Sequence, residues 1–202
     1  MSVPEAVLEL IEKFEANRRD YASGSYNEAR LRQEFLNPFF EALGWDMQNR
    51  QGYAEAYKDV IHEDAIRIGA DNKAPDYCFR IGGARKFFVE AKKPAVNVRE
   101  DISPAYQLRR YAWSAKLPLS ILTDFDEFAV YDCRIKPVHT DKASTARTMY
   151  LTYKDYAAQW DSIASVFSRD AILKGSFDKY AESGRGPSGE SAANLGLYSY
   201  QN

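Results

Sequence analysis

The spacing of apolar residues predicts two helices at the start of the chain. The first covers residues 4 to about 20 and has an apolar face at helical intervals, formed by Val7, Leu8, Ile11 and Phe14. The second begins after Asn27, a residue suited to the N-cap, and runs to about Leu43, where Gly44 can end it. Pro38 lies inside this second helix, so we expect a kink or a restart there.

Farther along, the pattern changes to the short runs typical of strands. Residues 76–81 alternate and residues 87–89 are apolar, and the Gly-Gly pair between them is a hairpin signal. Residues 45–73 have a mixed pattern, in which we expect only a helix over about 53–62. The remaining expected elements are a helix over about 101–115, strands over 119–123 and 128–131, and one or two helices between about 153 and 181.

This order of elements predicts an α/β fold. A helix inserted between pairs of strands implies a central mixed sheet, here of about four to five strands, flanked by helices. The chain of 202 residues suits one domain, which we place at residues 1–182, with the helices at about 153–181 as its C-terminal part. Residues 183–202 begin with a Gly- and Ser-rich stretch, so we expect a flexible linker or tail there.

Composition narrows the class of protein. The chain is 45% hydrophobic and 28% charged, as in ordinary globular domains. No run approaches the roughly 18 apolar residues of a membrane span, and no signal peptide is visible, so a cytoplasmic location without membrane contact is the default expectation. Two cysteines, Cys78 and Cys133, are too few for a disulfide framework or a structural zinc site.

Charge gives two opposing indications about nucleic-acid binding. The net charge of −2 argues against tight DNA binding by this domain alone, because phosphate neutralisation drives affinity. Between Arg85 and Lys116, however, basic residues outnumber Glu90, Glu100 and Asp101. The basic residues of this segment are Arg85, Lys86, Lys92, Lys93, Arg99, Arg109, Arg110 and Lys116. Each alone is most simply a solvated surface charge, whereas together they favour a phosphate-bearing substrate.

The hairpin brings acidic side chains together. Side chains alternate along a strand, so Glu90 and Lys92 share one face. If residues 82–84 form a three-residue loop, Ile81 pairs with Arg85 and Asp76 falls opposite Glu90. A two-residue loop would put Asp76 on the wrong face, so the arrangement requires an odd-length loop or a bulge.

Such a pair of acids suits a metal ion. Directly opposed side chains have Cβ atoms about 4.5–5.5 Å apart, and two carboxylates this close repel unless a cation lies between them. Mg²⁺, with Mn²⁺ as a substitute, is the expected ion. Lys92 beside it could orient or deprotonate water, or stabilise charge on a phosphate, and the ion would activate water. Pro-Asp and Glu-x-Lys are common structural patterns when they occur alone, so the combination carries the argument.

A second polar pair follows on the next helix. Gln107 and Tyr111 are four residues apart and therefore share one helical face. Taken alone, the pair could equally be a core tyrosine and an exposed glutamine.

The motifs together resemble a known group of nucleases. Pro75-Asp76, then thirteen residues, then Glu90-Ala91-Lys92, and the later Gln-x-x-x-Tyr resemble the PD-(D/E)xK nuclease superfamily. More narrowly, the chain is similar to the N-terminal nuclease domains of type I restriction-enzyme R subunits and of fused type IIG restriction–modification enzymes. The stretch from Asn27 to Trp45 resembles the helix that opens such domains, and the resemblance covers a core of about 26–133.

The resemblance implies a restriction-endonuclease-like fold and a Mg²⁺-dependent endonuclease that cuts double-stranded DNA. Asp76 and Glu90 would be metal ligands, with the carbonyl of Ala91 as a third. Lys92 would be the catalytic lysine. Gln107 and Tyr111 would support the site or contact the DNA backbone. Glu28 would be the acid of the opening helix that can approach the metal, often through water, and Glu34 on the same helix is the alternative.

Domains of this kind usually continue into a helicase or methyltransferase. No GxxxxGK[ST] loop and no Asn-Pro-Pro-Tyr motif occurs in these 202 residues. We therefore expect either an excised domain, with methyltransferase or translocase and specificity domains beyond residue 202, or a small free-standing relative. Two other functions stay open: a non-cleaving DNA-binding or assembly module of the same fold, and a DNA-repair or junction-resolving nuclease.

Overall fold

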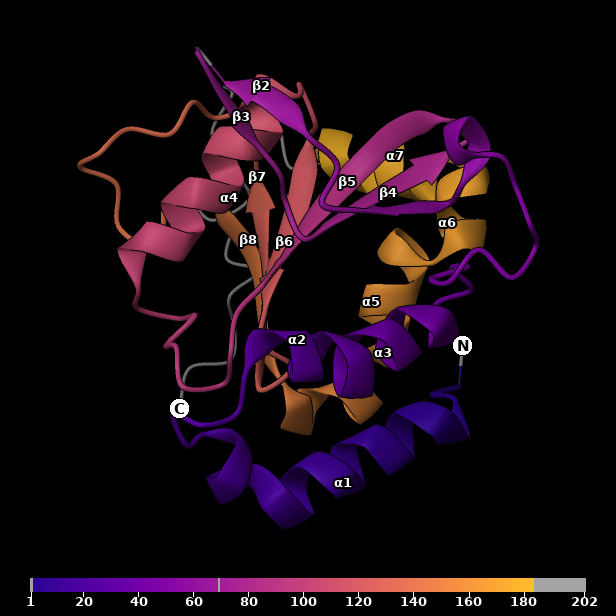
Figure 1. The fold of residues 1–202 in the computed structure, drawn as a ribbon, viewed down its shortest axis with the longest axis vertical. Coiled ribbons are helices and arrows are strands. Elements are labelled where there is room, and N and C mark those ends of the chain that lie inside the picture. The colour runs from indigo at the N-terminus through magenta and orange to yellow at the C-terminus, as the bar shows by residue number, and fades with distance from the viewer. Residues whose placement is uncertain (1, 69, 184–202) are drawn as a thin grey trace.

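The computed structural model describes residues 2–68 and 70–183. Its centre is a six-stranded sheet in the order β1-β4-β5-β6-β7-β8, in which only β5 and β6 run parallel (Figure 1). The strands are β1 (Val60–His62), β4 (Tyr77–Ile81), β5 (Ala84–Ala91), β6 (Leu119–Thr123), β7 (Glu127–Asp132) and β8 (Arg147–Thr152). A separate small hairpin consists of β2 (Ile66–Ile68) and β3 (Asp71–Lys73). The mixed sheet flanked by helices is confirmed, with one strand more than expected.

The two N-terminal helices lie close to their predicted bounds. The first is α1 (Glu5–Tyr21). The second is divided into α2 (Glu28–Leu31), a π-helical turn η1 (Arg32–Leu36) and α3 (Asn37–Ala42), so the irregularity expected near Pro38 is confirmed. The side chain of Asn27 caps α2 by accepting a hydrogen bond from the Arg30 N–H at 2.9 Å. Gly44 follows α3 with φ of +88°, a conformation that glycine adopts without strain.

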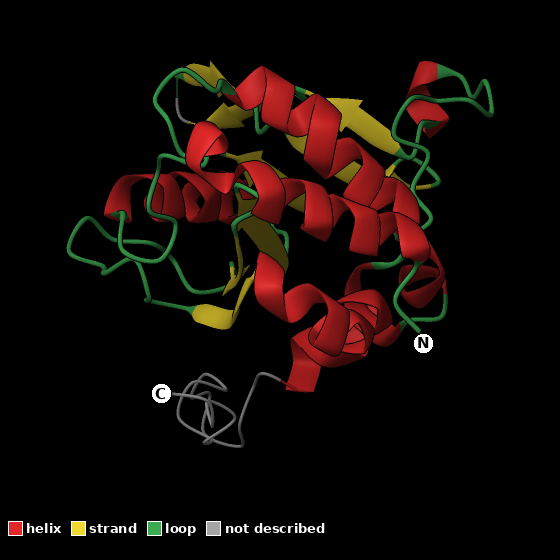
Figure 2. Ribbon diagram, turned by 90° about the horizontal axis from the view of Figure 1, so that it is seen from below, coloured by secondary structure: helices red, strands yellow, loops and turns green. Residues whose placement is uncertain are grey.

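Helices cover both faces of the sheet (Figures 1 and 2). On one face, Tyr77, Phe79, Phe87 and Val89 pack into a large aromatic core with α1, η1, α3 and the C-terminal helices. These helices are α5 (Tyr156–Phe167), α6 (Arg169–Leu173) and α7 (Ser176–Ser183). On the other face, α4 (Ile102–Ser114) packs on Cys78 and Phe88. No helix in the described part of the chain is long and apolar enough to cross a membrane.

Three parts of the expected fold were wrong or incomplete. The helix over 53–62 is instead a short 3-10 turn, η2 (Glu55–Tyr57), followed by β1. The helical spacing of Val60 and Ile61 indicated a helix, but these residues form an edge strand that pairs with Phe79 and Cys78.

The small hairpin β2–β3 and strand β8 were not predicted. Strand β8 is half-buried at every position, so it lacks the alternation of buried and exposed residues that indicates a strand. Three C-terminal helices replace the expected one or two, and the predicted tail, apart from Ser183, lies outside the described residues.

A β-bulge sets the register of the β4–β5 hairpin. The loop has two residues rather than three, because Ile81 pairs with Ala84 and Arg80 with Arg85. The register then shifts, so that Phe79 pairs with Phe87 and Lys86 is the extra residue. Extended by one more step beyond Tyr77 and Val89, this register aligns Asp76 with Glu90. The predicted loop length was wrong, but the bulge supplies the extra residue that the predicted alignment required.

Helix α4 is held in place by a buried ion pair. Arg109 is only 1% exposed, and its Nη1 lies 2.7 Å from Oδ2 of Asp141, while Nη2 donates to the Ile135 carbonyl at 3.3 Å. Burial alone would raise the pKa of Asp141, but hydrogen bonds from the Val138 N–H and from Arg109 lower the pKa below its usual range. The carboxylate therefore favours the folded state at neutral pH.

We expect Asp141→Ala to lower the free energy of unfolding at pH 7 by about 3 kcal/mol, because it leaves a buried guanidinium without its partner. Arg109→Met should cost less, since it removes the buried charge itself. The stabilisation of the folded state by Asp141 is complete above about pH 3.9, the pKa of an aspartate in the unfolded chain. This stabilisation is lost as pH falls through the lower pKa of Asp141 in the folded state. Urea unfolding at pH 7 and pH 3 measures both effects. A loss below about 0.5 kcal/mol, typical of exposed pairs, would contradict the prediction.

Candidate active site

Asp76 lies immediately before β4 and is held by contacts from three other segments. Its Oδ2 accepts a hydrogen bond from the Ala91 N–H at 2.7 Å, which joins it to the end of β5. Its Oδ1 lies 3.1 Å from Nη1 of Arg32, and its main-chain carbonyl accepts from the Glu63 N–H at 3.1 Å. The carboxylate thus faces the hairpin strand as the register predicted.

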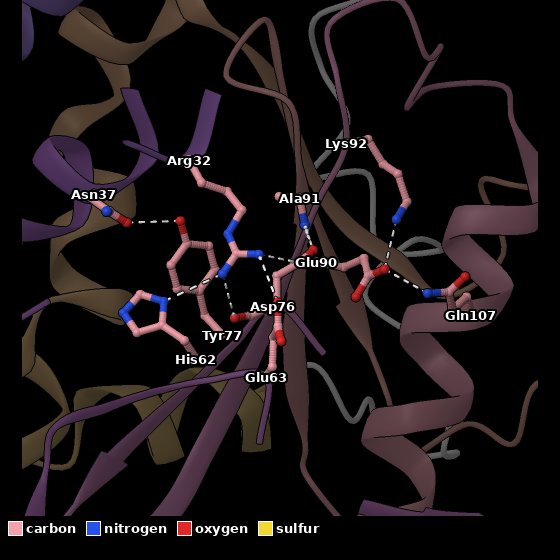
Figure 3. A network of polar contacts seen from close by, with 10 residues as sticks. All are labelled: Arg32, Asn37, His62, Glu63, Asp76, Tyr77, Glu90, Ala91, Lys92 and Gln107. Atoms are coloured by element: carbon pink, nitrogen blue, oxygen red, sulfur yellow. Dashed lines mark hydrogen bonds and ion pairs between the residues drawn. The ribbon is translucent and has the colours of Figure 1, made fainter. Parts of the chain in front are cut away.

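Glu90 and Lys92 meet on the α4 side of the sheet, as alternation along the strand predicted (Figure 3). Lys92 Nζ lies 2.7 Å from Oε1 of Glu90, and Gln107 Nε2 donates to the same oxygen at 2.6 Å. The other carboxylate oxygen of Glu90, Oε2, is buried and has no hydrogen-bond partner in the structure. The site therefore contains a carboxylate oxygen that is removed from water and left unpaired.

The electrostatic environment of these groups shows how close the charges are. Burial, and next the carboxylate of Asp76, raise the pKa of Glu90 to about 7, although Lys92 opposes the shift. For Lys92, burial acts to lower the pKa, but Glu90, Glu28 and Asp76 outweigh it and the pKa is raised. The lysine is therefore protonated at neutral pH. An excess of negative charge remains around Glu90.

Glu28 is the acid of the opening helix that belongs to this group. It is half-buried at the start of α2, and burial followed by repulsion from Asp76 raises its pKa. The alternative acid, Glu34, forms an ion pair with Lys13 of α1 at 3.1 Å. The structure thus brings Glu28, rather than Glu34, toward the predicted site.

The remaining predicted residues also lie at the site. Tyr111 is 8% exposed, and burial followed by the nearby charge of Glu90 raises its pKa. Gln107 is half-buried and donates to Glu90, so the reading of this glutamine as merely exposed is wrong. Tyr111 belongs to the core cluster on the α4 side, as the same reading had it, and its role at the site stays a prediction. Ala91 follows Glu90 in β5, and its N–H donates to the carboxylate of Asp76. A role for the Ala91 carbonyl as a metal ligand stays a prediction.

Sequence reasoning missed Arg32, which lies at the start of η1. Its guanidinium contacts Asp76, lies over the ring of Tyr77 at 4.8 Å from the centroid, and reaches Nδ1 of His62 at 3.5 Å. No local pattern marks this residue, because its partners are 30 to 45 residues away in sequence. The only available signal was its position one helical turn after Glu28.

The residues fit a magnesium ion of the kind that keeps several water ligands. Among residues 2–68 and 70–183, no three His, Cys, Asp or Glu side chains gather closely enough to form a complete ligand cluster. Mg²⁺ needs no such cluster, since one or two carboxylates, with waters and substrate phosphates, usually hold it. A cation near Glu90 and Asp76 would pair the buried Oε2 and relieve the repulsion that raises the pKa of Glu90.

Comparison with known proteins agrees with the motifs. Residues 57–139 match the family described as type I restriction enzyme R protein N terminus (HSDR_N). The predicted resemblance to this family is confirmed. The segment that matches this family includes Asp76, Glu90, Lys92 and the Gln-x-x-x-Tyr motif of α4.

One curated relative extends the similarity beyond the HSDR_N segment. The Type II restriction enzyme and methyltransferase RM.Eco57I of Escherichia coli is 37% identical over 180 residues, or 88% of this chain. The chain spans only 18% of the length of that relative. Among solved structures, a cryo-EM structure of a DrdV–DNA complex aligns with a TM-score of 0.45 and 16% identity over 80% of this chain and 97% of that chain.

Proposed function

We propose that this chain is a Mg²⁺-dependent endodeoxyribonuclease domain that hydrolyses phosphodiester bonds in double-stranded DNA. We further propose that it is the cleavage domain of a restriction or restriction–modification enzyme, with methyltransferase, translocase or specificity domains elsewhere. The observation that carries the proposal is the buried, unpaired Oε2 of Glu90 beside Asp76 and Lys92. The match to the HSDR_N family and the similarity to RM.Eco57I support the restriction role.

Asp76 and Glu90 are the residues that would hold the ion, with the Ala91 carbonyl as a further candidate. When bound, Mg²⁺ would lower the pKa of water and offset negative charge on the phosphate. Gln107 donates to Glu90 and fixes the orientation of its carboxylate. Asp76 is fixed in the same way by the Ala91 N–H.

Lys92 acts as a cation in this arrangement. The neighbouring carboxylates raise the pKa of Lys92, which supports a role in which the protonated side chain stabilises negative charge developing on the phosphate. Its ion pair with Glu90 holds Nζ near the carboxylates before DNA arrives. The structure thus favours one of the roles that the sequence left open for this lysine.

A plasmid assay tests the function. Supercoiled DNA incubated with the protein and Mg²⁺ or Mn²⁺ should be nicked or cut, and EDTA or Asp76→Ala should abolish the reaction. Cleavage that survives Asp76→Ala in a folded protein would place the chemistry elsewhere. Absence of Mn²⁺ binding at millimolar concentration would favour the non-cleaving module, and a preference for branched over linear DNA would favour the repair or junction-resolving nuclease.

A further inference from the structure

The Glu63 N–H holds the main-chain carbonyl of Asp76, but no ladder hydrogen bond orients its carboxylate. The residue precedes the first paired residue of β4, and Pro75 before it has no N–H to donate. Its carboxylate is therefore oriented by a side chain and by the N–H at the end of β5. The Ala91 N–H holds Oδ2, which leaves Oδ1 to a second donor.

That second donor is Arg32, whose guanidinium reaches two parts of Asp76 at once. Nη1 lies 3.1 Å from Oδ1, and Nη2 lies 3.4 Å from the main-chain carbonyl oxygen of Asp76. A planar guanidinium can make both contacts in one fixed geometry, whereas a lysine ammonium is a point charge on a flexible stem. The contact therefore fixes both the carboxylate and its backbone.

Arg32 is itself held by groups other than Asp76. The Tyr77 ring lies under the guanidinium, and Nη2 reaches Nδ1 of His62. His62 is oriented in turn, because its Nε2 lies 3.1 Å from the Met47 carbonyl oxygen, which can only accept. The phenol of Tyr77 donates to Oδ1 of Asn37 at 2.8 Å. The arginine thus has a prepared position in the absence of any ion.

From this geometry we infer that Arg32 is a positioning residue that orients the Asp76 carboxylate for a divalent cation. The inference rests on the proposed function, because it assigns Arg32 to the same site. In Figure 3, Arg32 lies on one side of Asp76. Glu90, Lys92 and Gln107 lie on the opposite side of Asp76. Arg32 therefore approaches from outside the space between the two acids and does not compete for it.

The direction in which metal affinity changes when Arg32 is removed shows whether Arg32 acts by orienting Asp76 or only by its charge. A positive charge near a cation site weakens cation binding by repulsion, so removing it would tighten binding if charge alone mattered. If Arg32 orients the ligand, removing it weakens binding instead. Loss of a hydrogen-bonding partner of a metal ligand typically costs about 10–100-fold in affinity.

Mn²⁺ titration calorimetry on the full chain, without DNA, tests the inference. We expect Arg32→Gln to raise the dissociation constant about tenfold or more, and Arg32→Lys to show a similar loss although it keeps the charge. Arg30→Gln is the matched control, since it removes a charge two residues away on the exposed side of α2 and should leave the affinity unchanged. Thermal unfolding of each variant establishes that it is folded.

A second measurement separates positioning from direct chemistry. DNA cleavage by Arg32→Gln should recover as the Mn²⁺ concentration is raised, because the defect lies in ion binding. Unchanged or tighter Mn²⁺ binding by folded Arg32→Gln and Arg32→Lys would overturn the inference while leaving the proposed function intact. Failure of the wild-type protein to bind Mn²⁺ would overturn both.

Discussion

Replacing Lys92 by alanine is expected to reduce the rate of DNA cleavage by about 10²–10³-fold, the usual cost of losing one group that stabilises transition-state charge. Lys92 is the cation that lies 2.7 Å from Glu90. Mn²⁺ binding should persist in this variant, since the lysine repels rather than binds the ion. Single-turnover cleavage of a plasmid at saturating Mn²⁺ measures the effect.

Lys93→Ala is the matched control for Lys92→Ala. The two residues are adjacent, but Lys93 is exposed whereas Lys92 is half-buried beside Glu90. The control should therefore retain a cleavage rate within a few-fold of wild type. Equal rates for Lys92→Ala and wild type would remove the lysine from the mechanism.

Saturating Mn²⁺ is expected to raise the unfolding midpoint of the wild-type protein by about 5–10 °C. An ion at one hundred times its dissociation constant stabilises the folded state by about 2.7 kcal/mol, and each kcal/mol moves the midpoint of a chain of this size by about 2–4 °C. Glu90→Gln should abolish the increase, because it removes the buried carboxylate that the ion would pair. Differential scanning calorimetry with and without Mn²⁺ measures both.

Glu90→Gln should also unfold at or above the wild-type midpoint when no metal is present. A neutral amide at this position no longer repels Asp76 and costs less to bury than an ionised carboxylate. Glu34→Gln is the control, since this carboxylate pairs with Lys13 on the surface and should leave the Mn²⁺ shift unchanged. An undiminished shift in Glu90→Gln would exclude Glu90 as a ligand.

The sequence predicted the placement of the candidate site residues better than it predicted the sheet around them. Asp76, Glu90 and Lys92 converge because alternation along strands and the pairing of a hairpin follow from local rules. Gln107 faces Glu90 because residues four apart share a helical face. These inferences needed only short stretches of chain, so no tertiary information was required.

The features that escaped prediction depend on contacts between distant segments. Strand β1 and strand β8 are edges, whose conformation comes from the neighbour they pair with rather than from their own residues. Arg32 reaches Asp76 from a helix 44 residues earlier. Its role follows from how η1 packs beside Tyr77, which no periodicity in the sequence encodes.

Because Lys86 is an extra residue in the β4–β5 hairpin, the pairing near the two acids does not depend on the number of residues near the loop. Since the bulge takes up one residue between the loop and the paired acids, deleting Lys86 would leave Asp76 aligned with Glu90, across twelve residues instead of thirteen. A domain with a hairpin shortened in this way would keep the two acids aligned at its base. Motif searches that demand a constant gap between the two acids would overlook such domains, whereas comparison of strand pairing would find them.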